Sequence, residues 1–107
     1  MANNKDATCP IAATLAYISG RWKAAILHHL AAGTRRFGEI AVRMPPISKK
    51  VLTQQLKELE RDGLIRRVQN PGAPMRVEYS LTDLGKSLST VLKEMSDWGK
   101  ANVLAKK

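Results

Sequence analysis

The feature that most constrains this fold is a capped amphipathic helix pattern followed directly by two short strand patterns. Ser48 can cap a helix that runs to about Arg61, because a serine oxygen accepts a backbone N–H left free in the first turn. Gly63 ends that helix. Leu64–Gln69 and Arg76–Leu81 then have the composition of strands, joined by a loop rich in proline and glycine. The chain is therefore predicted to place a hairpin immediately after a helix with one apolar side.

Three further helix patterns precede this unit and one follows it. Pro10 can start the first helix, because its missing N–H would be unpaired there in any residue. Apolar spacing predicts a second helix over about 21–32, a short third one from Phe37, and a long last one over about 83–104. The predicted fold class is mainly α with a small β-hairpin wing, a winged helix-turn-helix with additional N- and C-terminal dimerisation helices.

The charge balance favours a polyanionic partner. The chain has 18 Lys and Arg against 9 Asp and Glu, a formal net charge of +9. A basic surface without any partner would have the same composition. The chain lacks an apolar run of about 18 residues, so no membrane span is expected. The polar start over 1–8 does not resemble a secretion signal, and one cysteine cannot form an internal disulfide, so we expect a cytoplasmic protein.

The helix predicted over 48–61 has a polar side whose residue types suit the major groove of DNA. Successive residues lie 100° apart, which places the polar side opposite the leucines. Lysine reaches guanine acceptors or phosphates, and glutamine pairs with adenine. A solvated helix face would look the same, and the hairpin that follows is what favours DNA. The predicted contacts, with Lys57 on phosphate and the others at or near base edges, are Ser48, Lys49, Lys50, Thr53, Gln54 and Lys57.

The predicted hairpin carries arginines around an uncharged tip. Arginine is favoured in a narrow minor groove, where the negative potential is enhanced. We predict DNA contacts for Arg67 and Arg76, with more weight on Arg76 because we place it at the base of the wing. Arg67 also fits an ordinary solvent-facing strand position. Arg35 and Arg36, ahead of the third helix, could clamp phosphate, and a solvated pair explains them equally well.

Several motifs make the sequence resemble the HxlR family of bacterial winged-helix regulators, which are distantly similar to MarR proteins. They are Cys9-Pro10, Gly20-Arg21-Trp22-Lys23, Arg36-Phe37-Gly38-Glu39-Ile40, the run from Ile47 to Glu60, Asp62-Gly63-Leu64-Ile65 and the run from Arg76 to Thr82. The resemblance covers about residues 9–99 and implies a dimer that binds operator DNA, most often as a repressor. The sequence departs from the family pattern at Pro45-Pro46 and in the wing over 71–75.

This resemblance gives the predicted domain organisation. A flexible N-terminus over 1–8 precedes one domain over 9–107, with a recognition helix over about 48–61, a wing over about 64–81 and a C-terminal dimerisation helix over about 83–104. The last helix carries a wider apolar stripe than a terminal helix of so small a domain needs, and we expect it to pair with the first helix and with a two-fold partner. The stripe could also simply pack on its own domain. The predicted dimer interface comprises Ile11, Leu15, Ile18, Leu84, Leu88, Val91, Leu92, Met95 and Trp98.

Cys9 is a candidate redox sensor. Pro10 places it at a helix N-terminus, where free N–H groups stabilise a thiolate. Some members of the resembled family sense reactive electrophiles through a cysteine at this position, so a small electrophile or oxidant is a further candidate partner. A packed, inert cysteine fits the sequence equally well.

We find no motif of an enzyme, cofactor site or metal site. A P-loop, a dinucleotide fingerprint and a nucleophile elbow are all missing from the sequence. Glu58, Glu60, Asp62 and Glu78 are interpreted as surface charges. Two alternatives to an operator-binding regulator stay open: a winged helix that binds nucleic acid without sequence preference, and a protein-interaction module that has lost DNA binding.

Overall fold

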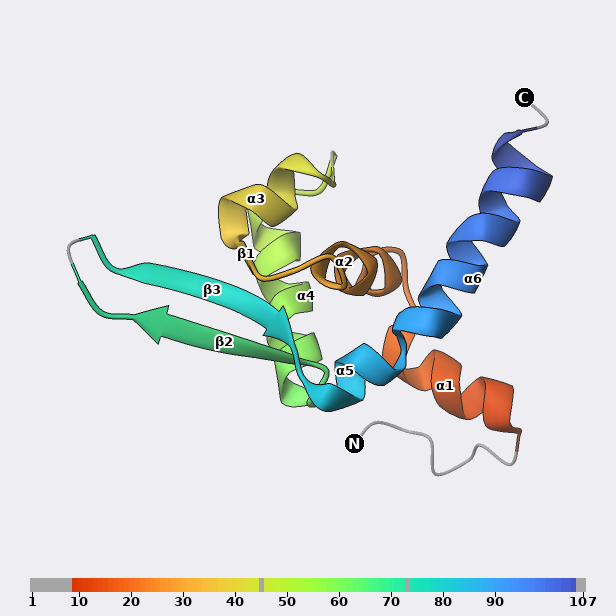
Figure 1. Cartoon of the computed structure of the whole chain (residues 1–107), viewed down its shortest axis with the longest axis horizontal. Helices are drawn as coiled ribbons and strands as arrows, with labels where there is room; N and C mark the ends of the chain where they lie inside the picture. Colours follow the sequence, from red (N-terminus) through yellow and green to blue (C-terminus); the bar gives the residue numbers. More distant parts are fainter. Residues whose placement is uncertain (1–8, 45, 73, 106–107) are drawn as a thin grey trace.

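The computed structural model describes residues 9–44, 46–72 and 74–105, and its helices surround one end of a small sheet (Figure 1). The predicted flexible stretch over 1–8 and Pro45 lie outside the described residues. The elements in chain order are α1 (Pro10–Ile18), α2 (Lys23–Leu30), β1 (Arg35–Arg36), α3 (Phe37–Val42), α4 (Lys49–Arg61), β2 (Ile65–Asn70), β3 (Arg76–Leu81), α5 (Asp83–Ser87), α6 (Ser89–Gly99) and the wider helical turn η2 (Lys100–Leu104).

Helix α4 has the predicted boundaries and the predicted cap. The Ser48 hydroxyl accepts the backbone N–H of Val51 at 3.1 Å, which satisfies one of the free donors of the first turn. Gly63 has a φ of +80°, in the left-handed region that favours glycine, and it reverses the chain after the helix. The chain therefore leaves α4 directly into β2, and the hairpin is placed beside the helix.

The sheet has three antiparallel strands in the order β1-β3-β2, one more than the predicted hairpin. The additional strand is β1, which we expected to be only an extended link. Arg35 pairs with Tyr79 and Arg36 pairs with Glu78, so the link before α3 is hydrogen-bonded to the hairpin. This pairing ties the start of α3 to the wing and confirms a mainly helical winged helix-turn-helix whose sheet is larger than predicted.

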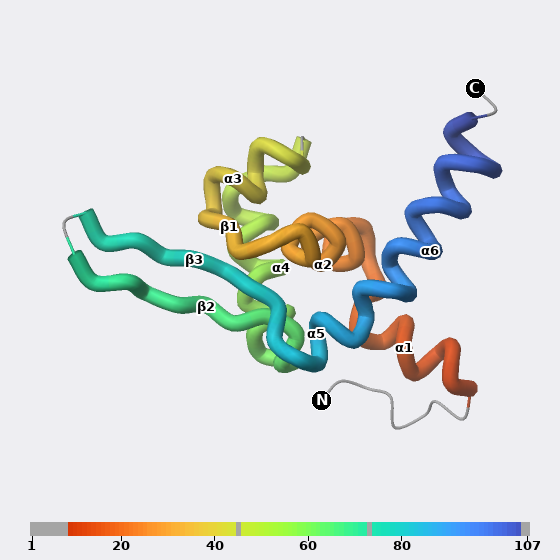
Figure 2. The backbone as a smooth tube through the Cα atoms, in the orientation of Figure 1, coloured from red at the N-terminus to blue at the C-terminus, as the bar shows by residue number. Residues whose placement is uncertain are grey.

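The hydrophobic core lies where α2, α3 and α4 meet the base of the sheet. Beyond that base the hairpin extends freely to one side, while α6 extends to the other (Figures 1 and 2). The buried apolar residues come from nearly every element: Ile18, Ile26, Leu27, Leu30, Ile40, Met44, Leu52, Leu56, Leu59, Leu64, Ile65, Tyr79, Leu81 and Leu92.

The C-terminal segment is not the single helix that we predicted over about 83–104. It turns at Leu88, whose backbone N–H donates to the Gly85 carbonyl, and it widens into η2 after Gly99. Gly85 is buried against the Leu64 carbonyl, so closely that any side chain at this position would collide with it. The Thr82 hydroxyl caps α5 by accepting the Gly85 N–H at 3.1 Å and donates to the Gly63 carbonyl. These contacts set the direction of α5, and the chain then turns at Leu88 to begin α6.

Candidate nucleic-acid interface

One side of α4 holds the helix in the core and the other side is open to solvent. Leu52, Leu56 and Leu59 are buried, each at most 2% exposed. The predicted contact residues Lys49, Lys50, Thr53, Gln54 and Lys57 are all exposed, as is the capping Ser48. A shallow groove runs along this side, lined by Lys50, Thr53, Gln54, Lys57, Glu58 and Arg61. The apolar anchor fixes the helix, so its polar side chains are presented outward from a rigid support.

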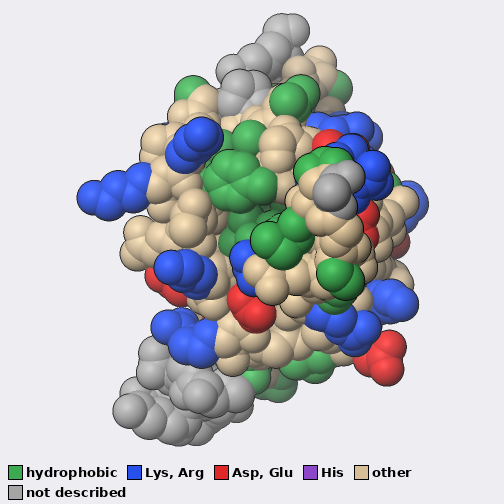
Figure 3. Space-filling model, turned by 90° about the vertical axis from the view of Figure 1, so that its left-hand side faces the viewer, with side chains coloured by type: hydrophobic (Ala, Val, Ile, Leu, Met, Phe, Trp, Pro, Cys, Tyr) green, Lys and Arg blue, Asp and Glu red, His purple; other side chains and the backbone are tan. Residues whose placement is uncertain are grey.

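The lysines of α4 are free to meet an external anion. Among the described residues, no ion pair involves Lys49, Lys50 or Lys57. The same holds within the described chain for the wing residues Arg67 and Arg76. Figure 3 views the molecule from the wing end. Lys and Arg side chains lie around the rim of the face seen there, and a hydrophobic cluster lies near its centre.

The arginines of the hairpin lie on two different faces of the sheet. Arg66 is opposite Ser80 and Arg67 is opposite Tyr79, so these two neighbours point to opposite faces. Arg76 pairs with Asn70 at the distal end of the hairpin, next to its tip, and shares the Arg66 face. Our prediction that Arg76 lies at the base of the wing is therefore wrong. Its distal position gives it the longer reach.

The two arginines before α3 have different surroundings. The Arg35 Nε donates to the His29 carbonyl at 3.1 Å, which ties β1 to the end of α2. Arg36 is exposed, and its backbone N–H donates to the Glu39 carboxylate at 2.8 Å. That N–H lowers the pKa of Glu39. Arg35 is half-buried and Arg36 is exposed, so Arg36 is the better candidate for a phosphate contact.

Two exposed arginines, one on α4 and one at the end of α3, were missed by the sequence reasoning. Arg61 lines the groove one helical turn beyond Lys57, a spacing of four residues that the sequence already contained. Arg43 lies at the end of α3 and lines a second depression with Arg36. Its side chain donates to the Glu39 carbonyl at 2.9 Å. The signal for Arg43 was weak, because nothing in its local pattern distinguishes it from other surface arginines.

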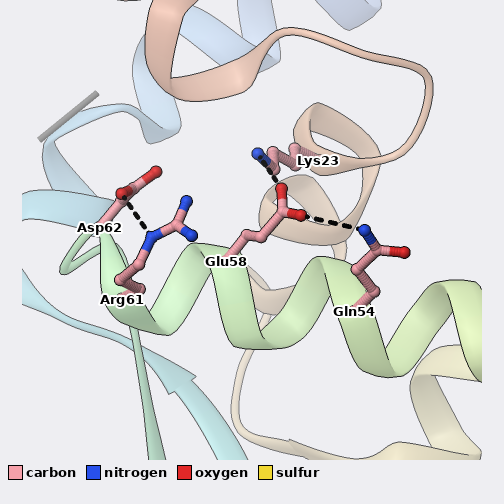
Figure 4. Close-up of polar contacts among 5 residues, drawn as sticks. All are labelled: Lys23, Gln54, Glu58, Arg61 and Asp62. Atoms are coloured by element: carbon pink, nitrogen blue, oxygen red, sulfur yellow. Dashed lines mark hydrogen bonds and ion pairs between the residues drawn. The ribbon is translucent and has the colours of Figure 1, made fainter. Parts of the chain in front are cut away.

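Glu58 and Asp62 are not the plain surface charges that we predicted. Glu58 on α4 forms an ion pair with Lys23 at the start of α2, with a distance of 2.7 Å between the Lys23 Nζ and the Glu58 Oε1 (Figure 4). The Lys23 ammonium holds the pKa of Glu58 below its ordinary value. The Asp62 side chain is only 5% exposed and lies 3.5 Å from the Arg61 Nε. The polar side of α4 is thus connected to α2 as well as to solvent.

A second surface, on α1, α5, α6 and η2, is strongly apolar. Of the predicted interface residues, Ile11 is 70% exposed and Trp98 is 65% exposed. Ile18 and Leu92 are buried in the core of the single chain, and Leu88 packs against that core. The remaining exposed apolar residues on this surface are Leu15, Leu84, Val91, Met95, Val103 and Leu104. So many exposed apolar side chains on these elements of a small protein indicate an interaction site.

Cys9 lies exposed at the N-terminus of α1. The backbone N–H groups of Ala12 and Ile11 lower the pKa of its thiol. This environment favours the thiolate, which is the nucleophilic form of cysteine.

The described residues contain no cluster of three or more side chains that could hold a metal ion. Of the helices in the described ranges, none combines the length and the hydrophobicity that a membrane span needs.

Comparisons with known proteins agree with this geometry. The sequence model of the HxlR-like helix-turn-helix family matches residues 17–107. The chain is 47% identical over 91 residues to the HTH-type transcriptional regulator YdeP of Bacillus subtilis, covering 85% of this chain and 71% of YdeP. The oxidised structure of the redox regulator HypR matches with a TM-score of 0.83 and 40% identity, over 88% of this chain and 97% of HypR.

A structure from Porphyromonas gingivalis W83, described as a transcriptional regulator of the MarR family, matches with a TM-score of 0.85. The two sequences are 34% identical, and the match covers 95% of this chain and 100% of the P. gingivalis chain. The family match spans most of the chain, including α4 and the wing. The protein is therefore not an enzyme but an HTH-type transcriptional regulator, and it belongs to the HxlR family.

Proposed function

We propose that this regulator binds a pseudo-palindromic operator as a homodimer and represses transcription. The observation that carries the proposal is the polar side of α4, which is exposed, free of ion pairs at its lysines within the described chain, and held from behind by buried leucines. In the complex, α4 lies in the major groove, with Lys49, Lys50, Thr53 and Gln54 toward the bases. Duplex DNA as the partner implies a cytoplasmic protein.

The wing and the link before α3 supply backbone contacts in this proposal. Arg76 at the tip of the hairpin and Arg67 on its other face reach the sugar-phosphate backbone or the minor groove. Lys57 and Arg36 contact phosphate at either side of the reading surface, and Arg35 supports β1 from within. Contacts of this kind set the register and supply salt-dependent affinity, whereas the side chains on α4 supply sequence preference.

The proposal is tested by selecting bound sequences from random duplex DNA at two salt concentrations. We expect a two-fold related pair of half-sites whose centres are about 34–36 Å apart, or a multiple of that distance. Affinity for the selected duplex should fall steeply with salt, with a slope near −0.9 for each phosphate contact. Recovery of sequences no different from the starting pool would instead indicate nucleic-acid binding without sequence preference, and no binding at all would indicate a protein-interaction module.

We further propose that Cys9 makes operator binding responsive to electrophiles. Support comes from the exposed thiol, its lowered pKa and its place at the start of α1, which also carries the exposed apolar residue Ile11. The relative HypR is described as a redox regulator. The thiolate sulfur adds to a ring carbon of the quinone, forming a C–S bond as the ring C=C π bond breaks. The electron pair moves to a carbonyl oxygen, which takes up a proton from water, and the ring becomes a hydroquinone thioether. The adduct at the start of α1 would disturb the dimer and hence the spacing of the two α4 helices.

Treatment with a quinone is expected to lower operator affinity at least about tenfold, a change that corresponds to about 1.4 kcal/mol. Cys9→Ser should bind the operator like the untreated protein and should not respond. Because the thiolate reacts and its pKa is lowered, the alkylation rate should rise with pH and reach half its maximum below the pH found for a free cysteine. Equal operator affinity before and after full alkylation would remove this part of the proposal.

A further inference from the structure

Three side chains connect the core of the protein to the groove along α4. Lys23 on α2 contacts one carboxylate oxygen of Glu58, with 2.7 Å between the Lys23 Nζ and the Glu58 Oε1. The Gln54 Nε2 lies 3.4 Å from the other oxygen, Oε2, and donates to it. Figure 4 shows the three side chains in a row, with the amide oxygen of Gln54 pointing away from Glu58. The exposed glutamine is therefore attached through one carboxylate to a second helix.

The ion pair that anchors this row is partly shielded from solvent, more at Lys23 than at Glu58. The side chains of Lys23 and Glu58 are 12% and 26% exposed, so the pair is not a typical surface salt bridge. Among the described residues, Lys23 has no other acidic partner. Glu58 lies one turn beyond Gln54 on the same helix, which places the carboxylate beside the amide without any change in α4.

The chemistry of the carboxylate fixes the orientation of the amide. Lys23 lowers the pKa of Glu58, which keeps the carboxylate ionised and therefore able only to accept hydrogen bonds. The Gln54 nitrogen must then face Glu58, since the reverse orientation would bring two oxygens together. Gln54 keeps its oxygen as an acceptor and one N–H as a donor for an external partner.

We propose that Glu58, held by Lys23, is a positioning residue that makes Gln54 select adenine over guanine at one base pair of each half-site. In the major groove adenine offers the N6 donor and the N7 acceptor, which match the oxygen and the remaining N–H of Gln54. Guanine offers two acceptors, O6 and N7, and leaves the fixed amide oxygen facing one of them. The inference rests on the proposed function, operator binding, and adds Glu58 as a determinant of the sequence specificity of that binding.

The test compares Glu58→Gln with the parent protein on duplexes that differ by one A·T to G·C change in each half-site. A neutral amide at position 58 can donate or accept, so it no longer fixes Gln54. A bidentate base contact discriminates by about 5- to 150-fold, and we expect Glu58→Gln to lower the preference for adenine at least about fivefold. Total affinity should hold or rise, because a negative charge near DNA is removed. The ratio of two affinities does not depend on the folded fraction of the sample.

The chain offers a matched control and a coupling test. Glu60→Gln removes the same charge from an exposed position on α4 and should leave the adenine preference unchanged. Gln54→Ala should abolish the preference for adenine. Adding Glu58→Gln to Gln54→Ala should not change that preference further. If Glu58→Gln keeps the full preference at every base pair, the inference is wrong while the proposed operator binding stands. If the parent protein shows no sequence preference, both fall together.

Discussion

Replacing Trp98 with glutamate is expected to convert the dimer into monomers and to weaken operator binding at least about 100-fold. Trp98 is 65% exposed in the single chain, so the fold of one chain does not depend on it. Tryptophan is a frequent hot-spot residue, and loss of a hot spot costs about 2 kcal/mol or more. A two-fold interface contains the residue twice, which raises the expected cost to about 4 kcal/mol, or about 1000-fold in dimer dissociation.

Sedimentation at micromolar concentration measures this prediction. The parent protein should sediment as a dimer, with twice the chain mass of 11.8 kDa. Trp98→Glu should sediment as a monomer, with the mass of one chain. Val42→Glu is the matched control for sedimentation. Val42 is 77% exposed but lies on α3, outside the apolar surface of α1, α5, α6 and η2. Operator affinity falls with dimer loss because the second half-site is no longer bound through the first. A Trp98→Glu protein that stays dimeric would exclude α6 from the interface.

Removing two lysines from α4 is expected to lower operator affinity about 1000-fold at 0.1 M salt. Lys50 and Lys57 both line the groove and have no ion pair in the described part of the chain, so two copies present four phosphate or base contacts. Each phosphate contact adds about 0.9 to the slope of log affinity against log salt. The two copies of Lys57 are the phosphate contacts of this set, so the double variant Lys50→Ala and Lys57→Ala should flatten that slope by at least about 1.8.

A second double variant separates direct contact from total charge. Lys93→Ala and Lys100→Ala remove the same number of charges from α6 and η2, where Lys93 already pairs with Asp97 at 2.9 Å. Long-range attraction by net charge would weaken DNA binding equally in both variants. Direct contact through α4 predicts a large loss for the first variant and a loss of less than about tenfold for the second. Equal losses would contradict the proposed placement of DNA.

Local sequence patterns predicted α4 best, because its cap, its apolar side and its terminal glycine all act within one helix. Ser48, Leu52 and Gly63 each have the predicted role. Strand β1 could not be predicted in the same way, since two residues have no periodicity and their pairing with Tyr79 and Glu78 spans more than forty positions. The turn at Leu88 was hidden because the apolar spacing continues across it, while contacts with Leu64 fix α5.

The same distinction applies to the candidate site. The exposure of the α4 lysines follows from 100° per residue and was predicted. The link from Lys23 through Glu58 to Gln54 was not, because it joins two helices that are 35 positions apart at the ion pair. The division of the wing arginines between two faces likewise depends on the strand register, which places Arg76 at the tip.

The most direct test of the central claim, that α4 lies in the major groove, uses the single cysteine of the chain. In a Cys9→Ser background, Thr53→Cys is coupled to a DNA-cleaving metal chelate. Lys100→Cys serves as the control, because Lys100 begins η2 and the C-terminal segment extends away from α4 (Figure 1). The account predicts two symmetric groups of cuts about 34–36 Å apart, or a multiple of that distance, from the probe at position 53 and none from position 100. Bound operator that stays uncut by the probe at position 53, or is cut equally by both probes, would contradict it.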